Sequence, residues 1–589
     1  MQTVVADTEV YENYFLASFM NVETGNVREF EMYPGSEPLN VLTIASILSK
    51  YRIVTFNGIG YDMPILTKAL RKATCSDLKA LSERIIVEGV RYWEHDFEVL
   101  KCDHVDLIEV APGIASLKIY GGRLHAAKLQ DLPIEPSALI TPEQRPLMRS
   151  YCRNDLQTTT DLFNRLKPQI ELREAMSASE GIDLRSKSDA QIAEAVIKKQ
   201  VEALLGTYLD KPGSMAGQSV TYDVPEFISF TTDDLKVVLN VVKWAEFPIS
   251  DKGKVEMPET VANLKIGIGD STYRMGIGGL HSTEKSVAHF ADVNYILIDR
   301  DVTGYYPAII LNCGLAPAQM DHHFSPVYRG IVNRRVEAKR RKDTVVSDSL
   351  KIVVNGSFGK FGSPYSRLYS PKLLIQTTIT GQLALLMLIE MLEQAGISVV
   401  SANTDGVVIR CHRTMTDVLA GIITDWEKRT GLETEETAYR SLYSRDVNNY
   451  IAVKTDGSVK LKGAYAPPGL QKNPTNQIST DAVVAFLKDG KHIVDTIVEC
   501  RDIRRFVTVR QVKGGAVDQQ GDYLGKAVRW YYAEGVEGCL CYKSNGYTVA
   551  RSAGAKPLME LPDRFPDDLD FLWYAEEAKS ILKDVGAQV

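Results

Sequence analysis

Two apolar, β-branched runs joined by a polar turn constrain the fold of this chain more than any other segment. The first run, AGISVV, ends at Val400, and the second, VVIRC, begins at Val407. Runs of this kind, bounded by turn residues, predict two buried strands of one hairpin. Asp405-Gly406 is a common hairpin-turn pair and is predicted to form the turn. Because Asp is a favourable turn residue in itself, any further role for this carboxylate depends on what else the chain contains.

The length and composition are those of a globular protein with several domains. The 589 residues correspond to about four domain-sized units. No uninterrupted apolar run reaches the roughly 18 residues that span a bilayer, and the N-terminus lacks the regions of a signal peptide. Eight cysteines without a CxxC pair predict a reduced protein without structural zinc. We therefore expect a cytoplasmic protein that does not associate with membranes.

The net charge of −7 argues weakly against nucleic-acid binding, but the basic residues are unevenly distributed. RRVEAKRRK, at residues 334–342, contains six basic residues and one acidic residue. A solvated helix face is the ordinary interpretation of such a run. Strand-like and helical segments alternate over residues 1–200, which is typical of an α/β domain. A second hairpin is predicted to turn at Asp456-Gly457.

A group of carboxylates lies near the N-terminus. Asp7 and Glu9 are two positions apart in VVADTEV, so a strand places both side chains on one face. Two neighbouring carboxylates repel each other and lose hydration, so we expect a cation between them, and a divalent metal suits this position. Two later segments, FNGIGYDMPIL and YCRND, add further polar side chains: Asn57, Asp62, Tyr151 and Asp155.

A second group of motifs follows in the middle of the chain. NYILIDRDVTGYYPAII places Asp301 at the end of a strand. LKIVVNGSFGKFG places Lys351 and Asn355 one helical turn apart, on one helix face. Asn403-Thr404-Asp405 comes next, at the tip of the predicted hairpin.

Taken in this order, the two groups resemble the motifs of family B DNA polymerases. The N-terminal group resembles the motifs of the 3′–5′ exonuclease domain of that family. The second group resembles the DxxSLYP, KxxxNSxYG and DTD motifs of its palm and fingers. The resemblance covers nearly the whole chain and implies an α/β multi-domain fold, in which a ribonuclease H-like exonuclease domain precedes a right-hand polymerase.

The resemblance also implies domain boundaries. These are the exonuclease domain at 1–200, the first part of the palm with a YxGG-like linker at 201–325, the fingers at 326–395, the second part of the palm at 396–470, and the thumb at 471–589.

In the exonuclease domain, the resemblance implies a two-metal site for phosphodiester hydrolysis. Its metal ligands would be Asp7, Glu9, Asp62 and Asp155. Tyr151 would orient the attacking water. Lys118, in SLKIYGGRL, and Asn57 would contact single-stranded DNA.

In the polymerase, the resemblance makes Asp301 and Asp405 the ligands of two Mg²⁺ ions, for which Mn²⁺ could substitute. Positive side chains would neutralise the phosphates of the incoming deoxynucleotide: Arg335, Lys339 and Lys351. Asn355 would hold the nucleotide by a hydrogen bond, and Tyr306 would stack under the deoxyribose. The basic run is then better interpreted as a triphosphate clamp.

Two further segments are assigned to DNA binding by the resemblance. MGIGGLHS is similar to the YxGG linker, with Ile277 in place of Tyr and with Gly278 and Gly279 retained, although a flexible turn is an equally good interpretation. Lys460 and Lys462 lie on one strand face and resemble a primer-gripping KxKG strand, whose lysines contact backbone phosphates.

Four positions depart from the family pattern. Asn403 replaces the first Asp of DTD, Gly406 and Gly304 replace serines, and Phe358 replaces a tyrosine. Asn403 removes one negative charge near the metal site, so it is expected to change the affinity or the preference for a metal. Activity itself is expected to persist, because both metal-ligand positions, Asp301 and Asp405, are retained.

The function that the resemblance implies is template-directed, primer-dependent DNA synthesis with 3′–5′ proofreading. No segment precedes the exonuclease motifs, which favours a compact, phage-like enzyme for phage DNA replication in the cytoplasm of a bacterial host. Two alternatives stay open. A catalytically impaired DNA-binding scaffold is favoured by Asn403, and an exonuclease-only protein is disfavoured by the retained Lys351 and Asn355.

The implied partners are primer-template DNA, deoxynucleoside triphosphates, a primase and a helicase. Polymerases that start from a terminal protein carry insertions between their polymerase motifs. Here Asp301 and Lys351 are 50 positions apart, as are Asn355 and Asp405. Because the predicted helices and strands fill both gaps, we expect no terminal protein.

Overall fold

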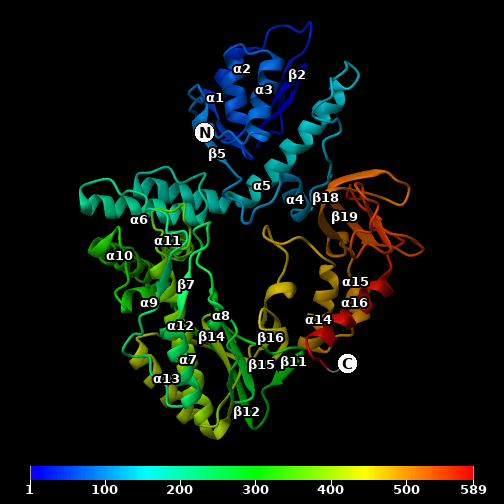
Figure 1. Cartoon of the computed structure of the whole chain (residues 1–589). Helices are drawn as coiled ribbons and strands as arrows, with labels where there is room; N and C mark the ends of the chain where they lie inside the picture. The colour runs from blue at the N-terminus through cyan, green and yellow to red at the C-terminus, as the bar shows by residue number, and fades with distance from the viewer. Residues whose placement is uncertain (1, 588–589) are drawn as a thin grey trace. The chain divides into compact units, whose positions relative to one another are not determined.

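The computed structural model describes residues 2–587, whose helices and strands are labelled in Figure 1. The contacts within the chain divide it into two compact units. Within the described residues, the N-terminal unit comprises residues 2–188, 468–478 and 498–574, and the second unit comprises residues 189–467, 479–497 and 575–587. The mixed α/β, multi-domain fold predicted from the sequence is confirmed. The predicted ranges 1–200 and 471–589 extend past the described residues at their outer ends, and all five predicted domain ranges stay predictions.

A five-stranded sheet forms the centre of the N-terminal unit, in the order β3-β2-β1-β4-β5. Its strands are β1 (Thr3–Tyr11), β2 (Tyr14–Asn21), β3 (Val27–Met32), β4 (Arg52–Thr55) and β5 (His104–Asp106). β1 runs antiparallel to β2 and parallel to β4.

Helices cover both faces of this sheet. They are α1 (Val41–Lys50), α2 (Asp62–Leu70), α3 (Cys75–Ile86) and α5 (Arg145–Glu180). Successive side chains of a strand point to opposite faces. Val4 and Ala6 accordingly pack with α1, α2 and α3, while Val5 packs with α5. By the same alternation, the side chains of Asp7 and Glu9 lie on the face of the sheet that packs with α5.

A second, four-stranded sheet belongs to the N-terminal unit, in the order β20-β18-β19-β21. Its strands are β18 (Thr508–Val517), β19 (Tyr523–Tyr532), β20 (Cys541–Tyr542) and β21 (Ala555–Pro557). The short helix α4 (Leu117–Arg123) contacts β18 and β19. The fully buried Arg529 of β19 donates hydrogen bonds to the carbonyl oxygens of Ala126 and Leu558, at 2.8 and 2.7 Å.

A ten-stranded sheet forms the core of the second unit, in the order β17-β16-β15-β12-β14-β13-β10-β9-β8, with β11 also paired to β15. Its strands are β8 (Ile266–Ile268), β9 (Ser271–Gly276), β10 (Gly279–Ser282), β11 (Val287–Phe290), β12 (Tyr295–Val302), β13 (Ser398–Asn403), β14 (Gly406–His412), β15 (Thr434–Asp446), β16 (Asn449–Lys454) and β17 (Val459–Leu461).

Helices and a two-stranded ribbon complete the fold. The helices are α6 (Asp189–Leu205), α7 (Asp233–Lys243), α8 (Glu259–Ala262), α9 (Tyr305–Asn312), α10 (Asp321–Arg340), α11 (Thr344–Phe361), α12 (Pro371–Gln394), α13 (Thr416–Thr430), α14 (Gln477–Asp489), α15 (Ile493–Glu499) and α16 (Phe571–Asp584), and the ribbon pairs β6 (Ser219–Thr221) with β7 (Glu246–Pro248). By length and composition α12 could cross a membrane, but its apolar stretch is entirely buried, as in the core helix of a globular unit.

The predicted hairpin forms between β13 and β14, but its turn lies one residue earlier than predicted. Asn403 pairs with Gly406, so the two-residue loop is Thr404-Asp405, with Thr404 in the left-handed region at φ +56°. Gly406 lies in β14 opposite Asp301, where a Cβ atom would collide with the Asp301 carboxylate. Glycine is therefore required at this position by the close approach of Asp301 and not by the turn.

Candidate active sites

The second unit brings Asp301 and Asp405 together at one end of adjacent strands. Asp301 is the second-last residue of β12, and Asp405 lies in the β13–β14 loop. The backbone N–H of Val302 donates to the carbonyl oxygen of Asp405 at 2.8 Å. Burial raises the pKa of both carboxyl groups, and each is raised further by a second carboxylate, Asp299 beside Asp301 and Asp301 beside Asp405.

Two lysines from the β17 edge face this carboxylate pair. Lys460 Nζ lies 2.9 Å from Asp299 Oδ2 and 3.3 Å from Asp301 Oδ2. Although burial opposes its charge, the ion pair with Asp299 raises the pKa of Lys460. Burial lowers the pKa of Lys462, while the negative charge of Asp405 acts in the opposite direction. In this structure both lysines therefore balance carboxylate charge.

Asp299 is a site residue that our sequence analysis missed. It is 4% exposed and lies two positions before Asp301, on the same face of β12. The hydroxyl of Tyr439 on β15 donates a short hydrogen bond to the same Asp299 oxygen that pairs with Lys460. The signal that identifies Asp7 and Glu9, two carboxylates with strand spacing, is also present in the sequence as Asp299-Arg300-Asp301.

Tyr306 connects three of the predicted motifs. Its ring stacks on Phe358 of α11, with centroids 3.8 Å apart and planes 5° apart. Its hydroxyl donates to the carbonyl oxygen of Gly278 at 2.9 Å. Gly278 lies in the tight turn between β9 and β10, and a Cβ atom on Gly279 would press against Thr404 in the hairpin loop. MGIGGLHS is thus a hairpin beside the Asp405 loop.

The predicted triphosphate-binding residues lie on two adjacent helices. Lys351 and Asn355 are exposed on α11, and Arg335 and Lys339 lie on α10. Lys339 Nζ is 3.8 Å from the carboxylate of Glu435, the residue that pairs with Asp301 across β12 and β15. Within the described residues, no hydrogen bond or ion pair joins Arg335, Lys351 or Asn355 to Asp301 or Asp405.

Asn403 has a local structural role. Its Nδ2 donates to the carbonyl oxygen of Val447 at 2.7 Å, and its Oδ1 accepts from the Thr404 hydroxyl at 3.1 Å. An ionised Asp could not donate the first of these bonds. The hydrogen bond to Val447 thus gives Asn at position 403 a structural role. This role leaves the Asp301–Asp405 pair intact.

The N-terminal unit gathers the other predicted carboxylates. Asp7 and Glu9 come from β1, Asp62 is the first residue of α2, and Asp155 comes from α5. The Thr8 hydroxyl donates to Asp62 Oδ1 at 2.7 Å. Burial raises the pKa of all four carboxyl groups, that of Asp62 to about 7, and for Asp7 and Glu9 the neighbouring carboxylates raise it further.

Lys118 and Tyr151 flank Asp155. Lys118, near the start of α4, forms a short ion pair with Asp155 Oδ1, and its Nζ lies 4.2 Å from the centroid of the Tyr151 ring. Burial and the charge of Asp155 raise the pKa of the Tyr151 hydroxyl. Lys118, predicted to contact DNA, here supplies positive charge to the carboxylates.

Two further residues of this region were not predicted. Asp106 accepts hydrogen bonds from the backbone N–H groups of Asn57 and Ile59, both at 2.8 Å, and so fixes the loop that leads to Asp62. Asn57 itself is exposed, with φ +69°. Cys152 Sγ donates to Asp7 Oδ2 at 3.5 Å. These contacts join segments that are far apart in the sequence, so no local pattern indicates them.

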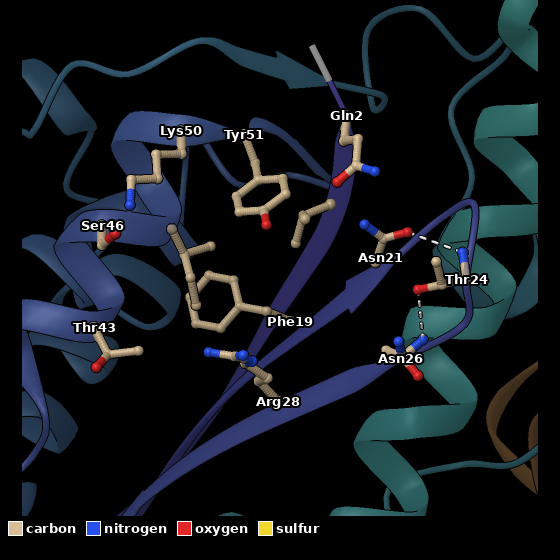
Figure 2. A pocket seen from close by; sticks show the side chains of 12 residues that line it. Gln2, Phe19, Asn21, Thr24, Asn26, Arg28, Thr43, Ser46, Lys50 and Tyr51 are labelled. Atoms are coloured by element: carbon tan, nitrogen blue, oxygen red, sulfur yellow. Dashed lines mark hydrogen bonds between the residues drawn. The ribbon is translucent and has the colours of Figure 1, made fainter.

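The N-terminal sheet also carries a pocket of about 390 Å³, which Figure 2 shows. It is lined by Val4, Phe19 and Ile47, with Arg28 and Lys50 among its polar residues. Val4 belongs to the face of β1 that packs with α1, so the pocket opens on the opposite face from Asp7 and Glu9. The hollow and the carboxylate cluster are therefore separate features.

Both carboxylate groups suit divalent cations. Their donors are carboxylate oxygens, which Mg²⁺ and Mn²⁺ prefer. Burial and mutual repulsion make the charged forms costly in the absence of a cation, as the raised pKa values of Asp7, Glu9, Asp301 and Asp405 indicate. The residues present therefore fit the predicted metals.

Comparisons with known proteins find similarity to polymerases over part of the chain. No protein-family model matches. DNA polymerase 1 of Aeropyrum pernix is 30% identical over 174 residues, which are 28% of this chain and 18% of that protein. DNA polymerase 1 of Saccharolobus solfataricus is 28% identical over 122 residues, which are 20% of this chain and 14% of that protein. The matches thus span less than a fifth of the length of each relative.

Among solved structures, the chain aligns with the family B DNA polymerase from the hyperthermophilic archaeon Pyrobaculum calidifontis, with 13% sequence identity and a TM-score of 0.43. The alignment covers 100% of this chain and 78% of that chain.

Proposed function

Starting from the resemblance to family B DNA polymerases, we propose that this chain is a template-directed, primer-dependent DNA polymerase with 3′–5′ proofreading. The partial sequence matches to two archaeal DNA polymerases support the proposal. One observation carries the proposal. The structure contains two separate carboxylate clusters, one in each compact unit, and each is assembled from the residues that the motifs indicate.

The strand order supports an exonuclease of the ribonuclease H-like class in the N-terminal unit. In the order β3-β2-β1-β4-β5, the central strand β1 carries Asp7 and Glu9. Asp62 and Asp155 join them from two helices that pack on the sheet. In the proposal, Tyr151 orients water and Lys118 moves from Asp155 to the phosphates of single-stranded DNA.

The second unit would contain the polymerase site. Asp301 and Asp405 would hold two divalent cations, which lower the pKa of the primer 3′-hydroxyl and neutralise phosphate charge when bound. Positive side chains of α10 and α11 would bind the triphosphate: Arg335, Lys339 and Lys351. Asn355 would hydrogen-bond the nucleotide. The ring of Tyr306, which is fixed by stacking on Phe358, would exclude the 2′-hydroxyl of a ribonucleotide. The DNA would be contacted by Gly278, Gly279, Lys460 and Lys462.

We further propose that the enzyme replicates phage or phage-derived DNA in the cytoplasm of a bacterial host. It would extend a nucleic-acid primer without a terminal protein, and it would therefore work with a primase and a helicase. The ranges 201–325 and 396–470 would form the palm, 326–395 the fingers and 471–589 the thumb.

Primer extension tests this proposal against a DNA-binding scaffold. Purified protein receives template, all four deoxynucleotides and Mg²⁺ or Mn²⁺, with and without an annealed primer. We expect templated extension only when the primer is present. DNA binding without any extension in either metal would support the scaffold. In a parallel reaction without primer, candidate proteins encoded nearby are added, and covalent attachment of a nucleotide to any of them would contradict the expected primer dependence.

A further inference from the structure

We propose that Cys152 gives the N-terminal carboxylate cluster a thiolate ligand, so that Cys152, Asp7 and Glu9 bind a thiophilic divalent cation such as Zn²⁺ or Cd²⁺. The inference rests on the proposed divalent-metal role of this cluster and specifies which further metals it takes. A thiolate favours Zn²⁺ and related ions, whereas Mg²⁺ prefers oxygen ligands.

The spacing of the three ligand atoms suits one tetrahedral ion. One ligand atom from each of Asp7, Glu9 and Cys152 lies within 4.8 Å of the other two. Cys152 Sγ is 3.5 Å from Asp7 Oδ2. Zinc bonds of about 2.3 Å to sulfur and about 2.0–2.2 Å to oxygen place two tetrahedral ligands about 3.5 Å apart. The separation of Cys152 Sγ and Asp7 Oδ2, which form a hydrogen bond in this structure, therefore also suits two ligands of one zinc ion.

Ser18 provides an independent indication of a ligand. It lies opposite Asp7 in β2, so the two side chains share one face of the sheet, and it is 0% exposed. Its hydroxyl faces Cys152 but has no well-formed hydrogen bond within the described residues. A buried hydroxyl without a partner costs about 1–3 kcal/mol. A metal-bound thiolate would accept this hydrogen bond.

Packing alone does not explain the arrangement. Cys152 belongs to a core cluster with Tyr14 and Met148, where a small apolar side chain would suffice. An apolar residue at this position would place no ligand atom beside Asp7 and Glu9. When the ion binds, a metal–sulfur bond replaces the S–H bond, the proton passes to water, and no oxidation or reduction occurs.

Cadmium binding to the full chain tests this inference. Cys539 and Cys541 have sulfurs 3.9 Å apart and could bind cadmium themselves, so both are first replaced by Ser. We expect this background protein, on titration with CdCl₂, to develop an ultraviolet thiolate-to-cadmium absorption that saturates at one equivalent. Adding Cys152→Ser should abolish the absorption, adding Cys102→Ser should retain it, and adding Ser18→Ala should weaken cadmium binding severalfold.

Two further measurements separate the possible failures. X-ray absorption of cadmium bound to the background protein should show one sulfur ligand. This measurement does not depend on the folding of a Cys152 variant, because Cys152 is left unchanged. Asp301 and Asp405 are expected to bind Mn²⁺ as well, so the metal role of the N-terminal cluster is reported by the share of Mn²⁺ binding, followed by electron paramagnetic resonance, that Asp7→Ala removes. Mn²⁺ binding by this cluster without any sulfur ligation of cadmium would overturn the inference and leave the proposed function standing. Absence of Mn²⁺ binding by this cluster as well would count against both.

Discussion

At the scale of single residues, Asp299 determines how Lys460 is shared between two carboxylates. It holds Lys460 at 2.9 Å while the same ammonium group lies 3.3 Å from Asp301. With Asp299→Asn, Lys460 should pair with Asp301 alone and compete with the metal. We expect the Mg²⁺ concentration for half-maximal incorporation to rise by about 10–100-fold, as for other partners of metal ligands. Titrating primer extension with Mg²⁺ measures this change.

Tyr439→Phe is the matched control for Asp299→Asn. It removes one hydrogen bond to Asp299 but keeps the charge that holds Lys460. We expect a smaller rise in the Mg²⁺ requirement for this variant. An unchanged Mg²⁺ requirement in folded Asp299→Asn protein would remove Asp299 from the site.

Tyr306 is the residue expected to reject ribonucleotides. Stacking on Phe358 and the hydrogen bond to Gly278 fix its ring. A forced steric overlap costs about 1–3 kcal/mol, so Tyr306→Ala should raise ribonucleotide insertion relative to deoxynucleotide insertion by about 5- to 150-fold. Tyr306→Phe keeps the ring and should retain discrimination. Single-nucleotide insertion kinetics check both variants, and unchanged selectivity in Tyr306→Ala would direct attention to Tyr305.

At the scale of elements, the β13–β14 hairpin positions Asp405 because β14 lies against β12. Gly406 permits that approach, since any Cβ at this position would meet the Asp301 carboxylate. Gly406→Ala should displace one of the two carboxylates and lower nucleotide incorporation by at least about 100-fold, since a 1 Å misplacement has effects of this size. Exonuclease activity should be unaffected.

Gly421→Ala provides a control for Gly406→Ala, because a Cβ atom at this position of α13 meets nothing within 4 Å. Steady-state incorporation rates for both variants make the comparison. Wild-type rates in folded Gly406→Ala protein would show that the close approach of β14 to β12 is not needed.

Local patterns predicted the elements and the carboxylates better than the contacts between them. Strand alternation and turn residues placed Asp7, Glu9, Asp301 and Asp405 correctly, because these signals act over a few residues. The Thr404-Asp405 loop was predicted one residue late, since the sequence does not reveal how closely β12 approaches Gly406. The contact of Cys152 with Asp7, 145 positions apart, lies beyond any local pattern.

At the scale of the whole molecule, the central claim is that two active sites work independently, one in each unit. The most direct test uses one labelled primer-template and one labelled single strand. On them, the wild-type protein is compared with Asp405→Ala and Asp155→Ala, and circular dichroism confirms that each variant is folded. We expect Asp405→Ala to lose nucleotide incorporation but keep 3′–5′ degradation, and Asp155→Ala to do the reverse. Loss of both activities from either single substitution in folded protein would contradict two independent sites.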